Sequence, residues 1–341
     1  MNRAHDGVLM RYPGFLSRGG TIGVTAPSMG VTDETDKKRF RNARDKLSAL
    51  GYTVKETSDV YGDYDGSGRS ASAEQRASEL CSLFTDPEVD VIISAKGGDY
   101  QEELEQFMDW KAIENNPKWF QGYSDNTNTT IRLTVEHDIA SIYAGNFGDF
   151  GMDPWHRSVS EELGFLEGRL DSQESFPLHE VFFSDRVTGT EPLNCTEKTE
   201  WISDSDHLSG RLIGGCMDIL EWMHRKKNLN IDGFLKKYGS DGILWYMETY
   251  EMNEQRIRHM LSGMIDDGWF DGASGFIFGR PLFYEGADYR TVVCEELGSL
   301  DVPVVTGVDV GHKAPRMVFI NGAMADLKIT DGKAVIRYEL S

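Results

Sequence analysis

The stretch Trp119-Phe120-Gln121-Gly122-Tyr123-Ser124-Asp125-Asn126-Thr127-Asn128 decides how the rest of the chain is organised. Its apolar beginning predicts a strand that ends at Gly122, and helix-capping side chains follow before the apolar-spaced Ile131, Leu133 and Val135. A strand, a tight turn with a serine at its apex and a helix form a nucleophile elbow, which exposes the hydroxyl and aims backbone N–H groups at the same space. An ordinary N-capping turn is the alternative, because the spacing is Gly-x-Ser-x-Asn rather than Gly-x-Ser-x-Gly.

The composition is that of a folded, acidic protein. The 341 residues carry 56 acidic and 35 basic side chains, which gives a formal net charge of −21. This charge argues against nucleic acid or an anionic membrane as a partner, because most of the surface would repel either one. The length and a hydrophobic content of 39% predict two domains with real cores. No segment has the pattern of a secretion signal or a membrane span, so we expect a soluble, cytoplasmic protein.

The N-terminal half has the pattern of a parallel sheet covered by helices. A small-residue strand at 21–28, a helical segment around Phe40 and a second strand at 52–54 form a βαβ unit. The strand at 89–94 leads to Lys96-Gly97-Gly98-Asp99, where a Gly-Gly turn lets backbone N–H groups approach a ligand. A plain strand-to-helix turn is an equal alternative. The sequence lacks Gly-x-Gly-x-x-Gly and a Walker loop, so we expect no nucleotide cofactor.

The segment at about 178–207 changes character, because helical periodicity fades and short β-type pieces appear. We therefore predict an α/β domain at 1–180, an interdomain crossing at 181–209 and a C-terminal domain at 210–341. Trp201 lies in the polar crossing segment, where an exposed ring would be free to stack on a planar substrate group. Packing inside a core is the alternative for this side chain.

The C-terminal part contains two further apolar strands that end on chemically useful side chains. The strand at 242–248 ends on Glu248, and the strand at 302–312 ends on His312. Alternation of apolar and polar residues toward the end of the chain predicts antiparallel hairpins.

Ser124, Glu248 and His312 thus follow separate strands, in an order that serine hydrolases use. A serine needs a histidine to take its proton, and the histidine needs a carboxylate that orients it and stabilises its cation. A helix cap, a strand-end surface charge and a loop histidine are the respective alternatives. The four cysteines lack zinc spacing and the other histidines form no cluster, so we expect no metal.

Several motifs, taken in order, resemble the LD-carboxypeptidase family of serine peptidases, and most of all its microcin C immunity branch. They are Gly122-Tyr123-Ser124-Asp125-Asn126-Thr127-Asn128, Gly210-Arg211-Leu212-Ile213-Gly214-Gly215-Cys216, Glu248 at a strand end, and the segment 307–312. The resemblance spans about residues 20–327. It implies an N-terminal parallel-sheet α/β domain that carries the serine and a C-terminal domain with a small β-barrel that carries the acid and the base. Homodimers are usual in the family.

The resemblance also implies roles for individual residues. Ser124 would be the nucleophile, His312 the general base and Glu248 its orienting carboxylate. The backbone N–H groups of Gly98 and Asp125 would form the oxyanion hole. The predicted substrate contacts are Gly97, Asp99 and Trp201, with Trp201 stacking on a nucleobase.

Two residues depart from the family pattern, and they bear on the substrate. Lys96 and Asp99 flank the glycine pair, where many family members have an arginine or apolar residue and then a tyrosine or threonine. An acidic side chain there disfavours a substrate carboxylate, unless Lys96 offsets its charge. The lead hypothesis is therefore a peptidase for a peptidyl- or aminoacyl-nucleotide of microcin C type. The alternatives are murein tetrapeptide recycling and a binding protein without turnover.

Overall fold

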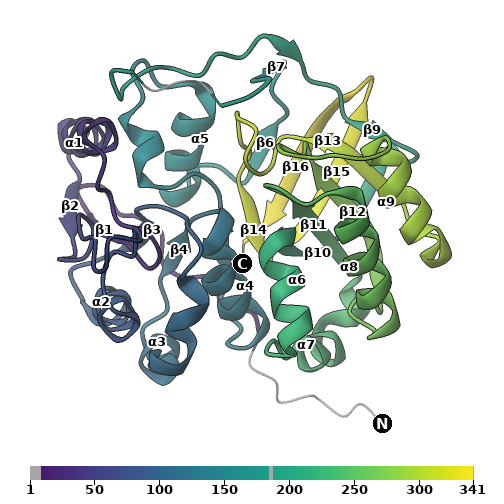
Figure 1. The fold of residues 1–341 in the computed structure, drawn as a ribbon, viewed down its shortest axis with the longest axis horizontal. Helices are drawn as coiled ribbons and strands as arrows, with labels where there is room; N and C mark the ends of the chain where they lie inside the picture. Colours follow the sequence, from purple (N-terminus) through teal and green to yellow (C-terminus); the bar gives the residue numbers. More distant parts are fainter. Residues whose placement is uncertain (1–8, 184–186, 341) are drawn as a thin grey trace.

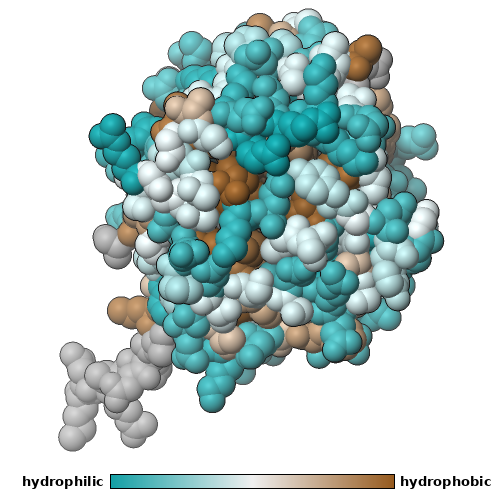
Figure 2. All heavy atoms as spheres, turned by 90° about the vertical axis from the view of Figure 1, so that its left-hand side faces the viewer, coloured by the Kyte–Doolittle hydropathy of each residue, from teal (hydrophilic) through white to brown (hydrophobic). Residues whose placement is uncertain are grey.

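The computed structural model describes residues 9–183 and 187–340. Two β-sheets lie side by side in this structure, with helices around them (Figure 1). The face that carries α1 and α2 is largely hydrophilic, with a few hydrophobic residues between the polar ones (Figure 2). Among the described residues, no helix combines the length and the apolar character needed to cross a bilayer.

The first sheet has six strands in the order β14-β5-β4-β3-β1-β2, and β1 to β5 run parallel. Their bounds are β1 Thr21–Thr25, β2 Thr53–Glu56, β3 Val91–Ser94, β4 Trp119–Gln121, β5 Ser141–Tyr143 and β14 Phe319–Asn321. The accompanying helices are α1 Glu34–Ala49, α2 Ala73–Thr85, α3 Trp110–Asn115, α4 Thr127–Val135 and α5 Arg157–Leu166. The predicted N-terminal α/β domain with a parallel sheet is confirmed.

Helix α1 illustrates how the local sequence builds this layer. The Asp33 side chain accepts hydrogen bonds from the backbone N–H groups of Thr35 and Asp36, which caps the first turn. Phe40 and Leu47 both lie on the buried face, on the same apolar stripe and about two helical turns apart. The helix therefore starts at its cap and packs through one apolar face.

The second sheet has eight strands in the order β6-β16-β15-β10-β11-β12-β13-β9, with a parallel centre from β10 to β13 and antiparallel flanks. Its strands are β6 Ser172–Glu174, β9 Ile202–Ser203, β10 His207–Cys216, β11 Ile243–Glu248, β12 Ala273–Gly279, β13 Val304–Val308, β15 Met324–Thr330 and β16 Lys333–Glu339. Helices α6 Met217–Lys226, α7 Ile231–Tyr238, α8 Glu254–Asp266 and α9 Tyr289–Leu297 belong to this part. The prediction was a C-terminal domain with a small β-barrel. The structure confirms a sheet-rich C-terminal domain, and its last two strands form the predicted antiparallel hairpin.

Short elements complete the chain. The two-stranded sheet pairs β7 Leu178–His179 with β8 Glu197–Lys198. The 3-10 helices are η1 Gln101–Phe107, η2 Ser124–Asn126, η3 Phe147–Gly151, η4 Gly239–Asp241 and η5 Gly298–Leu300.

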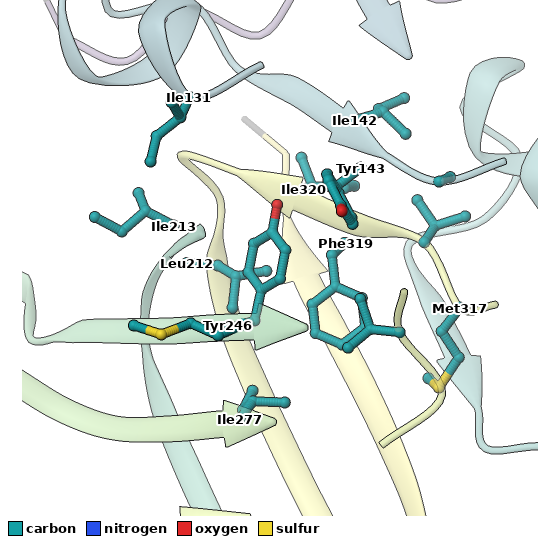
Figure 3. Close-up of a cluster of buried hydrophobic side chains, with 14 of the residues drawn as sticks. Ile131, Ile142, Tyr143, Leu212, Ile213, Tyr246, Ile277, Met317, Phe319 and Ile320 are labelled. Atoms are coloured by element: carbon teal, nitrogen blue, oxygen red, sulfur yellow. The ribbon is translucent and has the colours of Figure 1, made fainter. Parts of the chain in front are cut away.

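The two sheets exchange strands, so each contains a strand from the other half of the chain. Strand β14 pairs with β5 in the first sheet, whereas β6 pairs with β16 in the second. Strand β14 and helix α4 lie at the junction of the sheets (Figure 1). A shared core fills this junction, in which the ring of Tyr246 on β11 lies 5.5 Å from that of Tyr143 and 4.9 Å from that of Phe319 (Figure 3). This core holds residues of the two halves at a fixed separation.

Candidate active site

Ser124 stands at the sharp turn between β4 and α4. Its φ of 65° lies in the left-handed region, which costs a serine of the order of 1 kcal/mol and persists only when the surroundings hold it. The Ser124 N–H donates to the Tyr143 hydroxyl at 3.0 Å, and the Ser124 carbonyl accepts from Thr127 Oγ1 at 2.7 Å. A Cβ added at Gly122 would lie 2.8 Å from Asn126 Cγ, so the turn requires a glycine there. The local geometry is that of an elbow.

The structure brings Ser124, Glu248 and His312 together from three separate strands. His312 Nε2 lies 3.0 Å from Ser124 Oγ, and His312 Nδ1 lies 2.8 Å from Glu248 Oε2. Glu248 is fully buried at the end of β11. Burial acts to raise the pKa of Glu248, but His312 and the hydrogen bonds to the carboxylate outweigh it, so the net shift is downward. A buried carboxylate that stays ionised can orient the imidazole and stabilise its cation.

Tyr143, at the end of β5, is a member of this cluster that the sequence analysis missed. Its hydroxyl donates to Glu248 Oε1 at 2.6 Å while it accepts from Ser124 N. The strand pattern around Tyr143 marks it only as buried, and nothing local indicates where the hydroxyl goes. Its place at the carboxyl end of the strand next to β4 is the signal that was available.

The Gly97–Gly98 turn lies directly against the elbow. A Cβ added at Gly97 would come 3.2 Å from Ser124 Oγ and 3.7 Å from the Asp125 backbone nitrogen. Gly98 has a φ of +151°, and a Cβ there would lie only 2.4 Å from Ser28 Oγ. Gly98 therefore needs to be glycine, whereas a Cβ at Gly97 would fit tightly against the serine.

The Asp125 side chain ties this turn to the elbow. Its fully buried carboxylate accepts hydrogen bonds from the N–H groups of Tyr100 and Gln101 at 2.9 Å and from the Ser28 hydroxyl at 2.5 Å. Burial raises the pKa of Asp125 to about 7, against the opposing effect of these hydrogen bonds. The backbone donors predicted at Gly98 and Asp125 are thus held on one rigid unit.

Lys96 and Asp99, the two departures from the family pattern, do not pair with each other. Lys96 Nζ lies 2.7 Å from Asp36 Oδ2, whereas Asp99 is exposed. In the described part of the chain, no ion pair to Asp99 is found. Burial, and then the negative charges of Glu251 and Asp99, raise the pKa of Tyr250.

The expectation that Trp201 offers an exposed ring is wrong. Only 2% of the residue is accessible, and its Nε1 donates to Asp309 Oδ2 at 3.2 Å. Asp309 is itself buried beside Arg280, with 2.8 Å between the charged atoms. Trp201 therefore packs in the hydrophobic core, and its ring is not accessible to a ligand.

An aromatic rim, which we define as Phe182, Phe183, Phe283 and Tyr250, lies beside the histidine. The Tyr250 ring is 4.8 Å from the His312 ring, and the Phe283 ring is 5.1 Å from that of Tyr250. Phe182 and Phe183 contact Phe283 and are 52% and 41% exposed. The rim therefore presents accessible rings next to the reactive side chains.

A cavity of about 290 Å³ adjoins both His312 and the rim residue Phe183, and Arg316 and Asp149 also line it. Arg316 donates to Asp149 Oδ2 at 2.9 Å, to the Tyr123 hydroxyl at 3.1 Å and to the Gly311 carbonyl at 2.6 Å. This network was also missed, since its members are far apart in the sequence. It fixes the loop that carries His312 against the residue before Ser124.

A metal ion has three potential ligands here, because atoms of Cys216, Glu248 and His312 lie within 4.8 Å of one another. The carboxylate and the imidazole already use these atoms in hydrogen bonds. Burial, followed by the charge of Glu248, raises the pKa of the Cys216 thiol well above its usual value, which disfavours the metal-binding thiolate. The donor set fits a proton-transfer chain better than a metal site.

Comparison with known proteins places the chain in a family. The LD-carboxypeptidase N-terminal domain model matches residues 22–144, and the C-terminal domain model matches residues 209–327. The chain is 25% identical over 323 residues to the microcin C7 self-immunity protein MccF of Escherichia coli, covering 89% of this chain and 88% of that protein. It is 24% identical over 336 residues to the probable murein peptide carboxypeptidase of Bacillus subtilis, covering 96% and 95%. The solved structure of MccF in complex with glutamyl sulfamoyl guanosine has the same fold, with a TM-score of 0.79, 22% identity and coverage of 96% and 98%. This chain therefore belongs to the LD-carboxypeptidase family.

Proposed function

We propose that this chain is a serine peptidase that cleaves the acyl–nitrogen bond of a small peptide-like conjugate through an acyl-enzyme on Ser124. The observation that carries the proposal is the unbroken contact chain from Ser124 Oγ to His312 at 3.0 Å and from His312 to Glu248 at 2.8 Å. Such a chain moves a proton off the hydroxyl and disperses the positive charge that results.

In the proposed mechanism, Ser124 Oγ attacks the substrate carbonyl carbon while His312 takes the hydroxyl proton. The backbone N–H groups of Gly98 and Asp125 stabilise the negative oxygen that forms. The acyl–nitrogen bond then breaks, and His312 gives its proton to the leaving nitrogen. Water, deprotonated by His312, hydrolyses the ester on Ser124 and releases the acid.

We further propose that the conjugate is a peptidyl- or aminoacyl-nucleotide of microcin C type. The aromatic rim supports this, because its exposed rings beside His312 suit the flat face of a nucleobase. In this proposal the aromatic rim, rather than Trp201, stacks on the nucleobase. The relative MccF was solved with glutamyl sulfamoyl guanosine, which joins an acyl group to a nucleoside.

Murein tetrapeptide cleavage is the second candidate, in keeping with the relative from Bacillus subtilis. Its substrate ends in a free carboxylate, which the charge of Asp99 disfavours because Lys96 is engaged by Asp36. Binding without turnover is the third candidate. The homodimer and the cytoplasmic location stay predictions.

The test is cleavage of aminoacyl sulfamoyl adenosines with acidic, neutral and basic side chains, followed by mass spectrometry. Wild type should release the amino acid, and Ser124→Ala should lose this activity by at least about 10⁴-fold while staying folded. Ser209→Ala, which changes an exposed serine on β10, is the matched control and should retain full activity.

A murein tetrapeptide is assayed in parallel. If the enzyme released terminal alanine from the murein tetrapeptide but did not cleave the adenosine conjugates, the murein peptide would be the substrate and the nucleotide conjugate would be rejected. Binding of either compound without any release would favour the non-catalytic candidate and reject the peptidase proposal.

A further inference from the structure

The Tyr143 hydroxyl, like the His312 ring, contacts both the elbow of the first sheet and the acid of the second. Tyr143 ends β5, which neighbours the elbow strand β4. Glu248 ends β11 of the other sheet. The hydroxyl therefore lies where the two halves of the site meet.

The direction of each hydrogen bond follows from its partners. The Ser124 backbone nitrogen can only donate, so the Tyr143 oxygen accepts at 3.0 Å and keeps its own hydrogen for Glu248 Oε1 at 2.6 Å. His312 uses the other carboxylate oxygen, Oε2. The two oxygens of Glu248 are thus divided between Tyr143 and His312, which fixes the plane of the carboxylate.

Tyr143 remains a donor at neutral pH. Burial and then the adjacent charge of Glu248 raise the pKa of Tyr143 well above its usual value, so the hydroxyl keeps its proton. Only 1% of Tyr143 is exposed, and its ring packs 5.5 Å from the Tyr246 ring in the junction core (Figure 3). The hydroxyl is consequently held by a rigid ring.

We infer that Tyr143 is a positioning residue that holds Glu248 for His312 and stabilises the left-handed backbone of Ser124. The inference rests on the proposed nucleophilic role of Ser124. Without the hydroxyl, a part-buried backbone N–H and a buried carboxylate oxygen would each lose a partner, which is costly at low local dielectric.

Several titratable groups face the charge on Glu248, and we expect a change in pH dependence only from those that share a hydrogen bond with its carboxylate. The groups that face it are His312, Tyr143, Cys216, Tyr246, Tyr289 and Arg316. Tyr143 donates to Glu248 Oε1, so its replacement by Phe leaves the negative charge of the carboxylate less compensated by hydrogen bonding. That charge stabilises the imidazolium form of His312, so the base becomes available only at higher pH.

The test measures the labelling rate of Ser124 by a fluorophosphonate, which requires no knowledge of the natural substrate. A bond forms between Ser124 Oγ and phosphorus, the phosphorus–fluorine bond breaks, and the hydroxyl proton passes to His312. Intact-protein mass spectrometry follows wild type, Tyr143→Phe, Tyr246→Phe and Ser124→Ala over pH. Tyr246→Phe is the matched control. It removes a hydroxyl from the same core, and within the described residues that hydroxyl makes no hydrogen bond to Ser124 or Glu248.

Tyr143→Phe should slow labelling by about 10- to 100-fold, the usual effect of losing a hydrogen bond to a charged group. Its acid limb should move to higher pH. Tyr246→Phe should stay within about twofold of wild type, with an unmoved pH profile. Thermal melting of each variant checks that the fold is kept.

Equal labelling of wild type and Tyr143→Phe would overturn the inference while leaving the serine mechanism intact. Failure of wild type to label at Ser124 would instead reject the proposed function. In a Glu248→Gln background, Tyr143→Phe should have a smaller effect, because one of its two partners is already changed. An undiminished effect there would show that Tyr143 does not act through Glu248, and would overturn the inference even if the single variant were destabilised.

Discussion

The two sides of His312 differ in almost every physical respect. Toward Ser124 and Glu248 the side chains are hydrogen-bonded, with Ser124 half-buried and Glu248 without accessible surface. Toward the aromatic rim the rings are accessible, with Phe182 52% exposed, and they contact one another through apolar surface alone. Proton transfer needs fixed distances, which a buried polar network provides. Recognition of a flat ligand needs open apolar surface. We therefore expect changes on the buried side to lower kcat and changes on the rim to raise KM.

Glu248→Gln should produce the largest effect. It keeps the shape of the side chain but removes the charge that stabilises the His312 cation, so kcat should fall by about 10⁴-fold with little change in KM. The measurement is steady-state cleavage of the adenosine conjugate. Glu251→Gln, an exposed change three residues along the chain, should be close to wild type. A normal kcat for Glu248→Gln would show that the charge of Glu248 does not assist His312 in the reaction.

Gly98→Ala should have the next largest effect. The new Cβ would come 2.4 Å from Ser28 Oγ and 2.5 Å from Met29 Cγ, so the turn must move away from Ser124. Loss of one oxyanion donor lowers kcat by about 10²- to 10³-fold. Gly66→Ala is the matched control, because it also has a positive φ, of 74°, but nothing lies within 4 Å of the added carbon. If both variants lost activity equally, general backbone strain would explain the effect.

Phe183→Ala tests the rim. Loss of a stacking ring should raise KM for the adenosine conjugate by about 5- to 100-fold and leave kcat nearly unchanged. Phe107→Ala removes a phenyl ring that is 43% exposed elsewhere on the molecule, and should have no effect. Trp201→Phe should also leave KM unchanged, because that ring is buried. If Trp201→Phe raised KM and Phe183→Ala left it unchanged, Trp201 rather than the aromatic rim would contact the nucleobase.

Glu162→Gln should give the smallest effect, and it concerns stability on the buried side. Burial, together with the charge of Asp149, raises the pKa of Glu162 from 4.5 to about 8. Because the folded-state value lies above the unfolded value, wild type loses free energy of unfolding as pH rises from about 4.5 to 8. The Gln variant lacks this loss, so its stability relative to wild type should increase by up to about 1.4 kcal/mol per pH unit.

Urea denaturation of wild type and Glu162→Gln at pH 5, 6.5 and 8 measures this difference. Glu174→Gln, which changes an exposed carboxylate on β6, should show no such trend. A difference between Glu162→Gln and wild type that is flat with pH would mean that Glu162 is ionised throughout.

Much of the fold follows from local sequence pattern. The alternation of small apolar strands with amphipathic helices predicts the parallel first sheet, and the alternating tail predicts the hairpin of β15 and β16. The residues after strand ends were the natural candidates for the site, because the carboxyl ends of parallel strands share an edge. Ser124, Glu248 and His312 were selected in this way, and the structure has them within hydrogen-bond distance.

What could not be predicted depends on side-chain direction over long sequence separations. Trp201 lies among polar residues in the sequence, yet its indole points inward to Asp309, 108 positions away. Tyr143 looks like any buried strand residue, yet its hydroxyl meets Glu248, 105 positions away. Neither direction is encoded in the neighbouring residues, since both depend on how the two sheets pack.

The sequence by itself determined the family, the order of strands and helices, and which hydroxyl, carboxylate and imidazole follow strand ends, because these depend on local periodicity and motif spacing. Only the tertiary structure decided three other features. They are the exchange of β14 and β6 between the sheets, the hydrogen bond from Tyr143 to Glu248, and the exposure of the aromatic rim in place of Trp201. The physical reason is that burial and hydrogen-bond partners are properties of the packed core, where contacts between distant segments outweigh local preference.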